Sequence, residues 1–572
     1  VASAWMDSDT MRALAPADVQ ATFCRTLVRQ WAALGIDRAF IAPGSRSTPL
    51  AMALATDPRW SVEVFLDERS AAFAALGAGL VSGRPSVVLC TSGTAAAHFH
   101  AAVIEADLSC VPMLVVTADR PPELRDVGAA QTINQTNVFA NAVRWFHDPG
   151  VAAAEASGSW RSLAARCIHR TLGPRPGPVH LNLPFREPLL GRAVEIDGAD
   201  VPVGSLHGVM AVDPESLAEV VASIAGQRGV IVAGRGAPHE VAFAAESLGW
   251  PVFADARAPL QTEAIRCFDS LLRPGPFAES HRPDVVLRFG EAPASKVLAQ
   301  WITSSGARQI FVTGVDRWID VDHRVDLRMQ SDPVAVCAAI VKAARRAPAE
   351  WSSSWQRACD LAQRAVTDGL ANTELSGPVI ARRFAEGLPN GAQLVVSSSM
   401  PVRDLEWFGG ALPHLQVHSN RGANGIDGVL ATAIGVAVAS HAPTGVLIGD
   451  VAFLHDSSSL AALARRDVDL RIMVVDNDGG GIFHFLPQAS AIDSSTFEQL
   501  FGTPHGSDLA TLATAHGLST TKITAPDDIA RFARTPGPSV AVVRTSRDTD
   551  VEVHRRLHGA VAEALSSGAN QR

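Results

Sequence analysis

The apolar positions of this 572-residue chain fall into short runs that alternate with longer Ala-rich stretches. Runs rich in β-branched residues are typical of strands buried on both faces of a parallel sheet. The stretches Ser70–Val81 and Gly93–Ala106 have about the length of the helices that connect such strands. The pattern therefore predicts an α/β unit between about residues 16 and 190, with strands at Arg38–Ile41, Ser61–Phe65, Ser86–Cys90 and Val111–Val116.

The same alternation returns twice further along the chain. A Pro- and Gly-rich stretch at Gly191–Val212 is typical of a linker, and Arg345–Trp355, with Pro348 and three consecutive serines, indicates a second boundary. We therefore predict an α/β protein of three doubly wound parallel-sheet domains, covering residues 12–192, 210–345 and 356–550. The additional strands are predicted at Gly229–Ala233, Pro251–Ala254, Asp284–Phe289, Gln309–Thr313, Leu394–Ser398, Gly445–Ile448, Leu470–Val475 and Ser539–Val543.

Composition excludes several classes of protein. A formal charge of −9 provides no basic field for nucleic acid or an anionic membrane surface. No apolar run reaches the roughly 20 residues of a membrane span, and the acidic start does not resemble a secretory signal, so we expect a cytoplasmic protein. Seven cysteines without a CxxC pair argue against a disulfide framework or a structural zinc site.

Oxygen-bearing side chains follow two predicted strands in the last third of the chain. Asp450, after Gly449, and Asn477 lie 27 residues apart, which fits one strand–helix–strand unit. Both side chains should then emerge at the same edge of the sheet. Together with the carbonyl of Gly479 they would suit Mg²⁺, which prefers oxygen ligands and shares its shell with phosphate oxygens. Asp and Asn are also common turn residues, but the spacing and the glycine run Gly479–Gly481 favour a Mg²⁺-diphosphate site.

Glu68 follows the predicted strand Ser61–Phe65 and opens an Ala-rich helix. An acidic residue at a helix start is commonly an exposed charge that the helix dipole stabilises. In a functional interpretation, the same carboxyl group lies in an apolar pocket and shuttles a proton to a ring nitrogen. Position alone leaves both interpretations open.

Arginines recur in loops that follow predicted strands. The loop Pro43–Ser47 presents Ser45 and Arg46 with backbone N–H groups, an arrangement suited to a carboxylate or phosphate. Each arginine alone is typical of a surface ion pair. Several at strand ends would instead suit a substrate with more than one carboxylate, because guanidinium groups bind carboxylates bidentately. The other arginines of this kind are Arg120, Arg403 and Arg421.

These residues resemble the motifs of a known family. From about residue 17 to 543 the chain is similar to the thiamine diphosphate enzymes, specifically to the 2-succinyl-5-enolpyruvyl-6-hydroxy-3-cyclohexene-1-carboxylate (SEPHCHC) synthases of menaquinone biosynthesis. The resemblance implies a pyrimidine-binding first domain, a non-catalytic middle domain and a diphosphate-binding last domain. It rests on Pro43–Leu50, Asp67–Arg69, Thr91–Ala95, Ala118–Pro121, Ser419–Gly422, Gly425–Gly428 and Gly479–Phe483.

The resemblance also implies residue roles. Glu68 would hydrogen-bond the aminopyrimidine of thiamine diphosphate, and Ile426 would be the apolar wedge that bends this cofactor. Gly449 would contact the cofactor, while Asp450, Asn477 and Gly479 would hold Mg²⁺, with Mn²⁺ as an alternative. Contacts to the carboxylates of 2-oxoglutarate and isochorismate are implied for Ser45, Arg46, Arg120, Gln131, Lys296, Arg403 and Arg421, and an apolar wall for Ile482, Phe483 and Leu486.

The implied reaction is decarboxylation of 2-oxoglutarate followed by conjugate addition to isochorismate, at a site shared between subunits of a homodimer or homotetramer. The chain departs from the family pattern at Ala130, where Asn is common, which leaves one polar contact open. The motif around Lys296 matches only loosely. Two alternatives remain: another thiamine diphosphate carboligase, such as an acetolactate synthase, which would not need so many arginines, and a cofactor-binding protein without catalysis.

Overall fold

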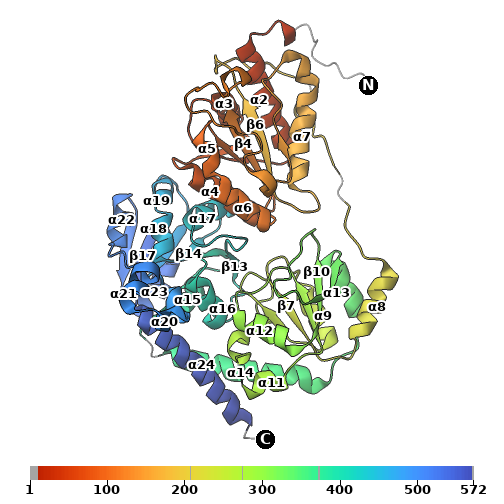
Figure 1. Ribbon diagram of the computed structural model, residues 1–572, viewed down its shortest axis with the longest axis vertical. Helices are drawn as coiled ribbons and strands as arrows, with labels where there is room; N and C mark the ends of the chain where they lie inside the picture. The colour runs from red at the N-terminus through yellow and green to blue at the C-terminus, as the bar shows by residue number, and fades with distance from the viewer. Residues whose placement is uncertain (1–10, 197, 206–207, 274, 372–373, 570–572) are drawn as a thin grey trace. The chain divides into compact units, whose positions relative to one another are not determined.

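The computed structural model describes residues 11–196, 198–205, 208–273, 275–371 and 374–569 (Figure 1). Their contacts divide them into two compact units. Unit 1 draws on the ranges 1–207, 420–441 and 455–468, whereas unit 2 draws on 208–419, 442–454 and 469–572. The predicted site residues are divided between the two units, so each unit is described separately.

Among its described residues, unit 1 contains a six-stranded parallel sheet in the order β2-β1-β3-β4-β6-β5. The strands are β1 Arg38–Ile41, β2 Ser61–Val64, β3 Ser86–Cys90, β4 Met113–Asp119, β5 Phe146–His147 and β6 Pro178–Pro184. The helices are α2 Pro16–Ala33, α3 Thr48–Thr56, α4 Glu68–Ser82, α5 Thr94–His98, α6 His100–Leu108 and α7 Trp160–Thr171, with α17 Val429–Ser440 and α19 Ser458–Leu463 from later in the chain. The predicted helix Gly93–Ala106 is interrupted at Phe99, which separates α5 from α6.

Unit 2 contains two parallel sheets among its described residues, in the orders β11-β10-β9-β7-β8 and β13-β12-β14-β15-β17-β16. The first comprises β7 Gly229–Ala233, β8 Val252–Ala254, β9 Val285–Phe289, β10 Arg308–Thr313 and β11 Val325–Gln330. The second comprises β12 Ala392–Val396, β13 Leu415–His418, β14 Thr444–Gly449, β15 Leu470–Asp476, β16 Ser519–Ile523 and β17 Ser539–Arg544.

Helices flank both sheets of unit 2 (Figure 1). Around the first sheet they are α8 Pro214–Ile224, α9 Val241–Leu248, α10 Phe268–Leu271, α11 Pro276–Ser280, α12 Lys296–Ser305 and α13 Pro333–Ala343. The others are α14 Ala349–Ala371, α15 Gly377–Gly387, α16 Met400–Phe408, α18 Asp450–His455, α20 Gln488–Ala491, α21 Ser494–Phe497, α22 Leu509–Ala515, α23 Pro526–Arg534 and α24 Arg547–Ala569.

Much of the second predicted boundary, Arg345–Trp355, lies in a helix. The three serines of Arg345–Trp355 lie in the first turns of α14, which begins at Ala349. Trp351 and Trp355 are buried in the core of the first sheet of unit 2, and α14 runs alongside α24 (Figure 1). The apolar face of α14 stabilises this helix, because Trp351 and Trp355 lie four residues apart and are both buried in that core.

Helices α4 and α17 make the tightest helix contact in unit 1. A Cβ atom added to Gly77 would lie 2.0 Å from the carbonyl oxygen of Thr432, and one added to Gly435 would lie 1.9 Å from that of Ala74. Real Cβ atoms do not approach carbonyl oxygens this closely, so glycine is required at both positions. These two glycines therefore fix α17 against the helix that begins with Glu68.

In the part of the chain that the structure describes, no helix combines the length and the apolar character needed to cross a membrane.

Candidate functional site

The tips of two neighbouring strands in unit 2 place Asp450 and Asn477 together, as the sequence spacing predicts. Strands β14 and β15 pair in parallel with Gly449 opposite Val475, so both end at one edge of the sheet. The buried carboxylate of Asp450 accepts hydrogen bonds from the backbone N–H groups of Asn477 at 3.1 Å and Gly479 at 2.9 Å. Burial raises the pKa of Asp450. The carboxylate of Asp450 therefore joins the two loops that follow these strands.

The side chain of Asn477 has an acceptor that the described residues leave unused. Its Oδ1 atom is buried and has no hydrogen-bond partner among them. Leaving such an atom unpaired costs about 1–3 kcal/mol, so buried acceptors without a partner usually mark a missing ion, water or ligand. A hard cation that takes oxygen ligands would satisfy this atom. The donor set of Asp450, Asn477 and the Gly479 carbonyl thus fits the predicted cation.

Two further ligand-type residues, which the sequence analysis did not select, lie beside Asp450. The Nε2 atom of His505 is 3.3 Å from Asp450 Oδ2 and 3.9 Å from Asp476 Oδ1. Asp450, Asp476 and His505 each offer a ligand atom within 4.8 Å of the others. Asp476 ends β15 and could have been found from the same strand-end signal. His505 stands in a distant loop, where no spacing pattern connects it to Asp450.

The glycine run that follows Asn477 is needed for contacts within the protein. A Cβ atom on Gly479 would lie 1.9 Å from the carbonyl oxygen of Gly502, and one on Gly480 would lie 2.1 Å from that of Phe501. Gly481 lies similarly close to the side-chain amide of Asn477. The sequence analysis connects this glycine run with a Mg²⁺-diphosphate site, which stays a prediction. Within the protein, Gly479 and Gly480 let the main chain pass close to residues 501–502.

The residues predicted to form an apolar wall come soon after this glycine run in the chain. Ile482 and Phe483 belong to a short 3-10 helix, η4 (Gly481–Phe485), and Leu486 comes immediately after it. Ile482 and Phe483 are half-buried and Leu486 is exposed. The Phe483 ring packs against Phe501 with centroids 5.4 Å apart. The wall residues therefore present apolar surface from a segment that is anchored to the same loop as the glycines.

Arg403 lies in the first turn of α16, behind a strained residue. Ser399, which precedes this helix, has a φ of +71°, a region that non-glycine residues rarely occupy. Its carbonyl oxygen accepts a hydrogen bond from Arg403 Nη1 at 2.6 Å. Burial lowers the pKa of Arg403, but a guanidinium remains charged at neutral pH. Strain of this kind gathers at functional sites, and it marks Ser399 as a residue that the sequence pattern did not identify.

Lys296 is the exposed first residue of α12, in the first sheet's part of unit 2. The loop that precedes it is connected to α16, because the backbone N–H of Ala294 donates to Glu406 Oε2 at 3.1 Å. Glu406 lies one turn after Arg403 on that helix. The structure thus links the loop before Lys296 to the helix that carries Arg403.

In unit 1, Glu68 is the half-buried first residue of α4. Asp67 caps the helix by accepting from the backbone N–H of Arg69 at 2.9 Å, and it also accepts from Ser458 Oγ at 2.7 Å. Burial, together with the nearby charge of Glu68, raises the pKa of the Cys90 thiol well above its ordinary value. The cap and the Ser458 contact therefore fix the backbone from which the Glu68 carboxyl extends.

Ser45 and Arg46, in the loop between β1 and α3, differ in how deeply their side chains are buried. Ser45 is exposed, whereas Arg46 is only 4% exposed and donates to the carbonyl of Phe185 at 3.0 Å and to Glu187 Oε1 at 2.9 Å. Arg46 Nε is buried without a hydrogen-bond partner among the described residues. Arg46 therefore anchors this loop, while its Nε–H has no partner among the described residues.

Arg120 contacts the residue before Gln131, which lies eleven positions after Arg120 in the chain. Arg120 Nη2 donates to the carbonyl of Ala130 at 3.2 Å, next to Gln131. Gln131 has a φ of +55°, and its carbonyl accepts from Ser92 Oγ at 3.0 Å. The backbone carbonyl of Ala130, which any residue would provide, makes this contact, so the departure from Asn does not affect it.

Arg421 and Ile426 lie in a loop that a buried acid holds in place. Glu105, on α6, is 1% exposed, and its carboxylate accepts from the backbone N–H groups of Gly422 at 2.7 Å, Ala423 at 2.7 Å and Asn424 at 2.9 Å. Ile426 is half-buried and lies two residues before Gly428, the N-cap of α17. The sequence analysis missed Glu105, because nothing in the sequence of α6, which also contains His100 and Asp107, distinguishes this acid.

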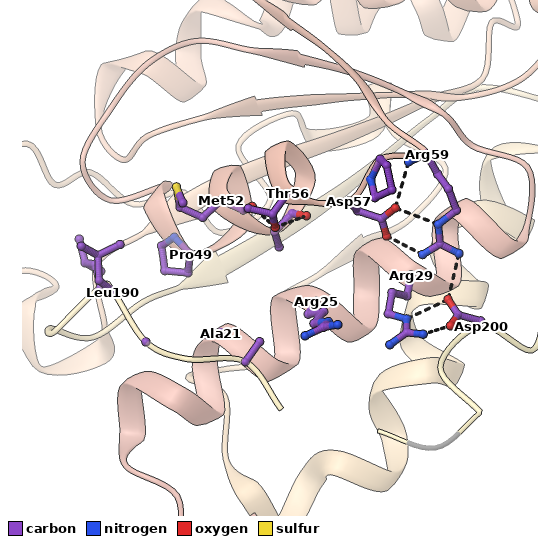
Figure 2. A pocket seen from close by; sticks show the side chains of 15 residues that line it. Ala21, Arg25, Arg29, Pro49, Met52, Thr56, Asp57, Arg59, Leu190 and Asp200 are labelled. Carbon is purple, nitrogen blue, oxygen red and sulfur yellow. Dashed lines mark hydrogen bonds and ion pairs between the residues drawn. The ribbon is translucent and has the colours of Figure 1, made fainter. Parts of the chain in front are cut away.

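Unit 1 also contains an open cavity that none of these residues line. It has a volume of about 540 Å³ and is lined by residues of α2 and α3, by the turn Asp57–Arg59, and by Leu189, Leu190, Gly191, Ala193 and Asp200 (Figure 2). Arg29 and Arg59 both contact Asp200 in it, and Arg59 also contacts Asp57. The described residues that line it include no predicted site residue. This cavity is therefore not the site that the motifs indicate.

Comparison with known proteins shows which family this chain belongs to. Residues 21–138 match the thiamine pyrophosphate enzyme N-terminal TPP binding domain, residues 212–396 the middle domain and residues 410–542 the C-terminal TPP binding domain. The 2-succinyl-5-enolpyruvyl-6-hydroxy-3-cyclohexene-1-carboxylate synthase of Chloroflexus aurantiacus is 38% identical over 94% of this chain and 96% of its own length. The chain belongs to the SEPHCHC synthase family of thiamine diphosphate enzymes.

Other members of the SEPHCHC synthase family align over a similar length. The enzyme of Myxococcus xanthus is 38% identical over 96% of this chain and 99% of its own, and that of Rubrobacter xylanophilus is 39% identical over 93% and 97%. The family confirms the three α/β domains and the thiamine diphosphate-dependent enzyme that the sequence predicts. The observed Asp450 and Asn477 pair lies in the domain that matches the C-terminal TPP binding model.

Proposed function

We propose that this chain is an SEPHCHC synthase that decarboxylates 2-oxoglutarate and adds the remaining succinyl unit to isochorismate, with release of CO₂, in menaquinone biosynthesis. The near full-length similarity to enzymes of that name is the observation that carries the proposal. The name of their product contains a succinyl group on an enolpyruvyl-hydroxycyclohexene carboxylate, which these two substrates would supply. Thiamine diphosphate, when bound, supplies a nucleophilic carbon and accepts the electrons that remain when CO₂ leaves.

The diphosphate of the cofactor would be held in unit 2 through Mg²⁺, or Mn²⁺ in its place. Asp450, Asn477 and the Gly479 carbonyl are the proposed ligands, next to Gly449. The unpartnered Asn477 Oδ1 atom supports this assignment, since oxygen ligands are those that Mg²⁺ prefers. His505 and Asp476 would orient the Asp450 carboxylate, since groups around a ligand commonly set its direction.

Glu68 would donate or accept a proton at the aminopyrimidine ring of the cofactor. The capped start of α4 supports this role, because it fixes the position of the Glu68 backbone. Ile426 would press against the cofactor from a loop that Glu105 holds. Ile482, Phe483 and Leu486 would exclude water from the reacting carbon.

Basic and polar residues would bind the carboxylates of the two dicarboxylate substrates. Arg403 and Arg421 are proposed for 2-oxoglutarate and for the growing product, with Ser45, Arg46, Arg120, Gln131 and Lys296. The contact between Arg120 and the Ala130 carbonyl supports a shared role for Arg120 and Gln131. The contact of Ala294 with Glu406 supports a shared role for Lys296 and Arg403.

We further propose a cytoplasmic homodimer or homotetramer, in which the pyrimidine-binding domain at 12–192 of one subunit faces the diphosphate-binding domain at 356–550 of another. The middle domain would cover residues 210–345. Light scattering of the purified protein measures this state, and a monomer that retains full activity would refute the shared site.

The test of function is an omission series. Purified protein is incubated with Mg²⁺, thiamine diphosphate, 2-oxoglutarate and isochorismate, and the products are identified by mass. The SEPHCHC mass is expected only in the complete mixture. Product with pyruvate in place of 2-oxoglutarate, at an equal rate, would favour an acetolactate synthase-like carboligase. Cofactor binding without any product would indicate a non-catalytic protein.

A further inference from the structure

His554, on α24, contacts two segments of unit 2 that carry residues proposed to contact the substrate or cofactor. Its ring centroid lies 5.0 Å from that of Phe408 on α16 and 4.9 Å from that of Phe485 in η4. Helix α16 carries Arg403, and η4 contains part of the proposed apolar wall. His554 is only 3% exposed, so these contacts lie in the interior of unit 2.

One hydrogen bond orients the His554 ring. Its Nε2 atom lies 2.6 Å from Oδ1 of Asp404, which is also buried. A carboxylate can only accept, so Nε2 carries the hydrogen of this bond. The other ring nitrogen, Nδ1, is buried and has no hydrogen-bond partner among the described residues. The direction of the ring, and with it the contact to Phe485, therefore depends on Asp404.

Asp404 in turn connects α16 to the start of α15. A Cβ atom added to Gly377, the first residue of α15, would lie 2.5 Å from Asp404 Oδ2. The backbone N–H of Gly377 donates to Asp550 Oδ1 at 2.8 Å, so two buried acids lie at this helix start. Burial, together with the charge of Asp404, raises the pKa of Asp550 to about 7. In these surroundings His554 supplies the N–H donor that stabilises the charge of Asp404.

The position of α16 decides where Arg403 lies. Arg403 and Asp404 are consecutive, so the bond to His554 holds the same turn of the helix that carries the guanidinium. Further along α16, Glu406 accepts from the backbone N–H of Ala294 at 3.1 Å. These two contacts hold α16 against α24 and against the loop before α12. A displacement of about 1 Å at a binding group can cost roughly 100-fold in rate, so the bond between His554 and Asp404 bears directly on Arg403.

We propose that His554 is a positioning residue for the oxoacid substrate, which aligns Arg403 through its hydrogen bond to Asp404 and holds the proposed apolar wall through Phe485. The inference rests on the proposed function, because it takes Arg403 as a residue that binds a carboxylate of 2-oxoglutarate. His554 does not touch the substrate in this arrangement and acts through its two neighbours.

Variants of the full-length protein separate the hydrogen bond from the packing. His554→Phe keeps a ring against Phe485 and removes the donor to Asp404. His554→Gln keeps an N–H donor that can reach Asp404 and loses the ring. The matched control is His558→Phe, the same substitution one turn later on α24, where the imidazole Nδ1 contacts Ser270 Oγ at 2.8 Å and not Asp404.

Steady-state kinetics with thiamine diphosphate and Mg²⁺ give the readout, with 2-oxoglutarate and isochorismate varied in turn. His554→Phe should raise the KM for 2-oxoglutarate roughly tenfold or more, because a charge-assisted bond is lost, and change kcat and the KM for isochorismate less than about threefold. His554→Gln should show the reverse: a KM for 2-oxoglutarate within about threefold of the wild type, and a kcat lowered at least about threefold because the wall then admits water.

His558→Phe should leave all three kinetic parameters within about twofold of the wild type. A merely structural role for His554 would lower melting temperatures without this opposite behaviour of the two His554 variants. An unchanged KM for 2-oxoglutarate in His554→Phe, the same increase in His554→Gln, or the same increase in His558→Phe would overturn the proposal.

A second measurement needs no substrate. If the wild type forms no SEPHCHC, the proposed function fails, and hydrogen–deuterium exchange then decides whether His554 aligns α16. His554→Phe should raise the exchange of the backbone amides of residues 400–408, while residues 214–224 of α8 serve as the internal control. Unchanged exchange at residues 400–408 would refute the alignment.

Melting temperatures identify a variant that does not fold. Should His554→Phe be such a variant, Asp404→Asn replaces it, because it keeps the shape of the side chain and removes the charge that strengthens the bond to His554. Asp404→Asn should raise the KM for 2-oxoglutarate at least about threefold. An unchanged KM in that variant would equally overturn the proposal.

Discussion

The carboxylate of Glu105 accepts a hydrogen bond from the backbone N–H of Gly422, 317 positions later in the chain, at 2.7 Å. The same carboxylate holds the next two N–H groups, so one buried acid fixes the loop that carries Arg421 and leads to Ile426. Three donors from one main-chain segment on one carboxylate form an anion-binding turn, with the anion supplied by the protein itself.

Glu105→Gln should lower kcat/KM for 2-oxoglutarate by at least tenfold. The neutral amide offers one acceptor and faces the remaining N–H groups with its own N–H₂, and hydrogen bonds to a charged group typically contribute about 1.5–3 kcal/mol. Steady-state kinetics and thermal unfolding measure the two effects. Glu123→Gln, an exposed acid that pairs with Arg186, is the control. Equal kinetics in both variants would contradict a positioning role for Glu105.

Glu68→Gln should abolish exchange of the thiazolium proton of bound thiamine diphosphate while the cofactor still binds. The side-chain amide of glutamine cannot exchange a proton with the aminopyrimidine ring as the Glu68 carboxyl group would. Hydrogen–deuterium exchange of the cofactor followed by NMR measures the rate, and calorimetry measures binding. Glu63→Gln, an acid on β2 that pairs with Arg466, serves as control. If exchange persists in Glu68→Gln, Glu68 has no part in this step.

Arg403→Gln should weaken the use of 2-oxoglutarate far more than that of pyruvate. Loss of one charge-assisted contact to the second carboxylate costs about 1.5–3 kcal/mol, which corresponds to roughly 10- to 150-fold in kcat/KM. The measurement is the ratio of kcat/KM for the two oxoacids. Arg531→Gln, on the exposed face of α23, should leave this ratio unchanged. An equal loss for both oxoacids would instead favour the acetolactate synthase-like alternative.

Gly435→Ala should destabilise the protein by about 1–3 kcal/mol or more, because the new methyl group would collide with the Ala74 carbonyl and force α17 from α4. Gly559→Ala is a matched control within helix α24, where an added Cβ meets no atom within 4 Å. That substitution should stabilise by up to about 1 kcal/mol, since alanine is the better helix former. Thermal unfolding compares the two, and similar melting temperatures would refute the close approach.

Acid should destabilise the wild type more than His180→Phe. Burial lowers the pKa of His180 to about 3, below its ordinary 6.5. As the pH falls below 6.5, His180 is protonated in the unfolded chain but stays neutral in the folded chain, so the free energy of unfolding decreases. At pH 5.5 the decrease in the free energy of unfolding that is due to His180 is about 1.4 kcal/mol. Denaturant unfolding at pH 7.5 and 5.5 measures the difference, and an equal pH dependence of both proteins would exclude His180 as a source.

The sequence could predict those elements whose pattern is local. Strands β1, β3 and β7 begin and end where predicted, because continuous apolar runs mark buried parallel strands. Strand β6 was missed because polar His180 and Asn182 interrupt its apolar run; both are buried and hydrogen-bond to Thr117. The edge strand β16 was missed because its sequence, Ser-Thr-Thr-Lys-Ile, is mostly polar and exposed.

The candidate site residues likewise include some that a local sequence pattern predicts and others that it does not. Asp450 and Asn477 could be paired because one crossover unit separates them, and the observed contact at 3.1 Å agrees. His505 and Glu105 could not be found, because loop closure brings His505 to Asp450 in unit 2 and distant helix packing brings Glu105 to residues 422–424 in unit 1, and neither leaves a periodic signal. The burial of Arg46 likewise depends on Glu187, on a distant part of unit 1, rather than on the motif that contains Arg46.

The close approach of the main chain at residues 479–480 to residues 501–502 has a mechanical consequence. Asn477 lies just before this contact and Phe483 just after it, so the same contact supports both the proposed metal ligand and the proposed apolar wall. Neither can be repositioned alone. A compound that separated Gly479 from Gly502 would displace both the proposed metal ligand and the proposed apolar wall. It would do so without occupying the proposed substrate site.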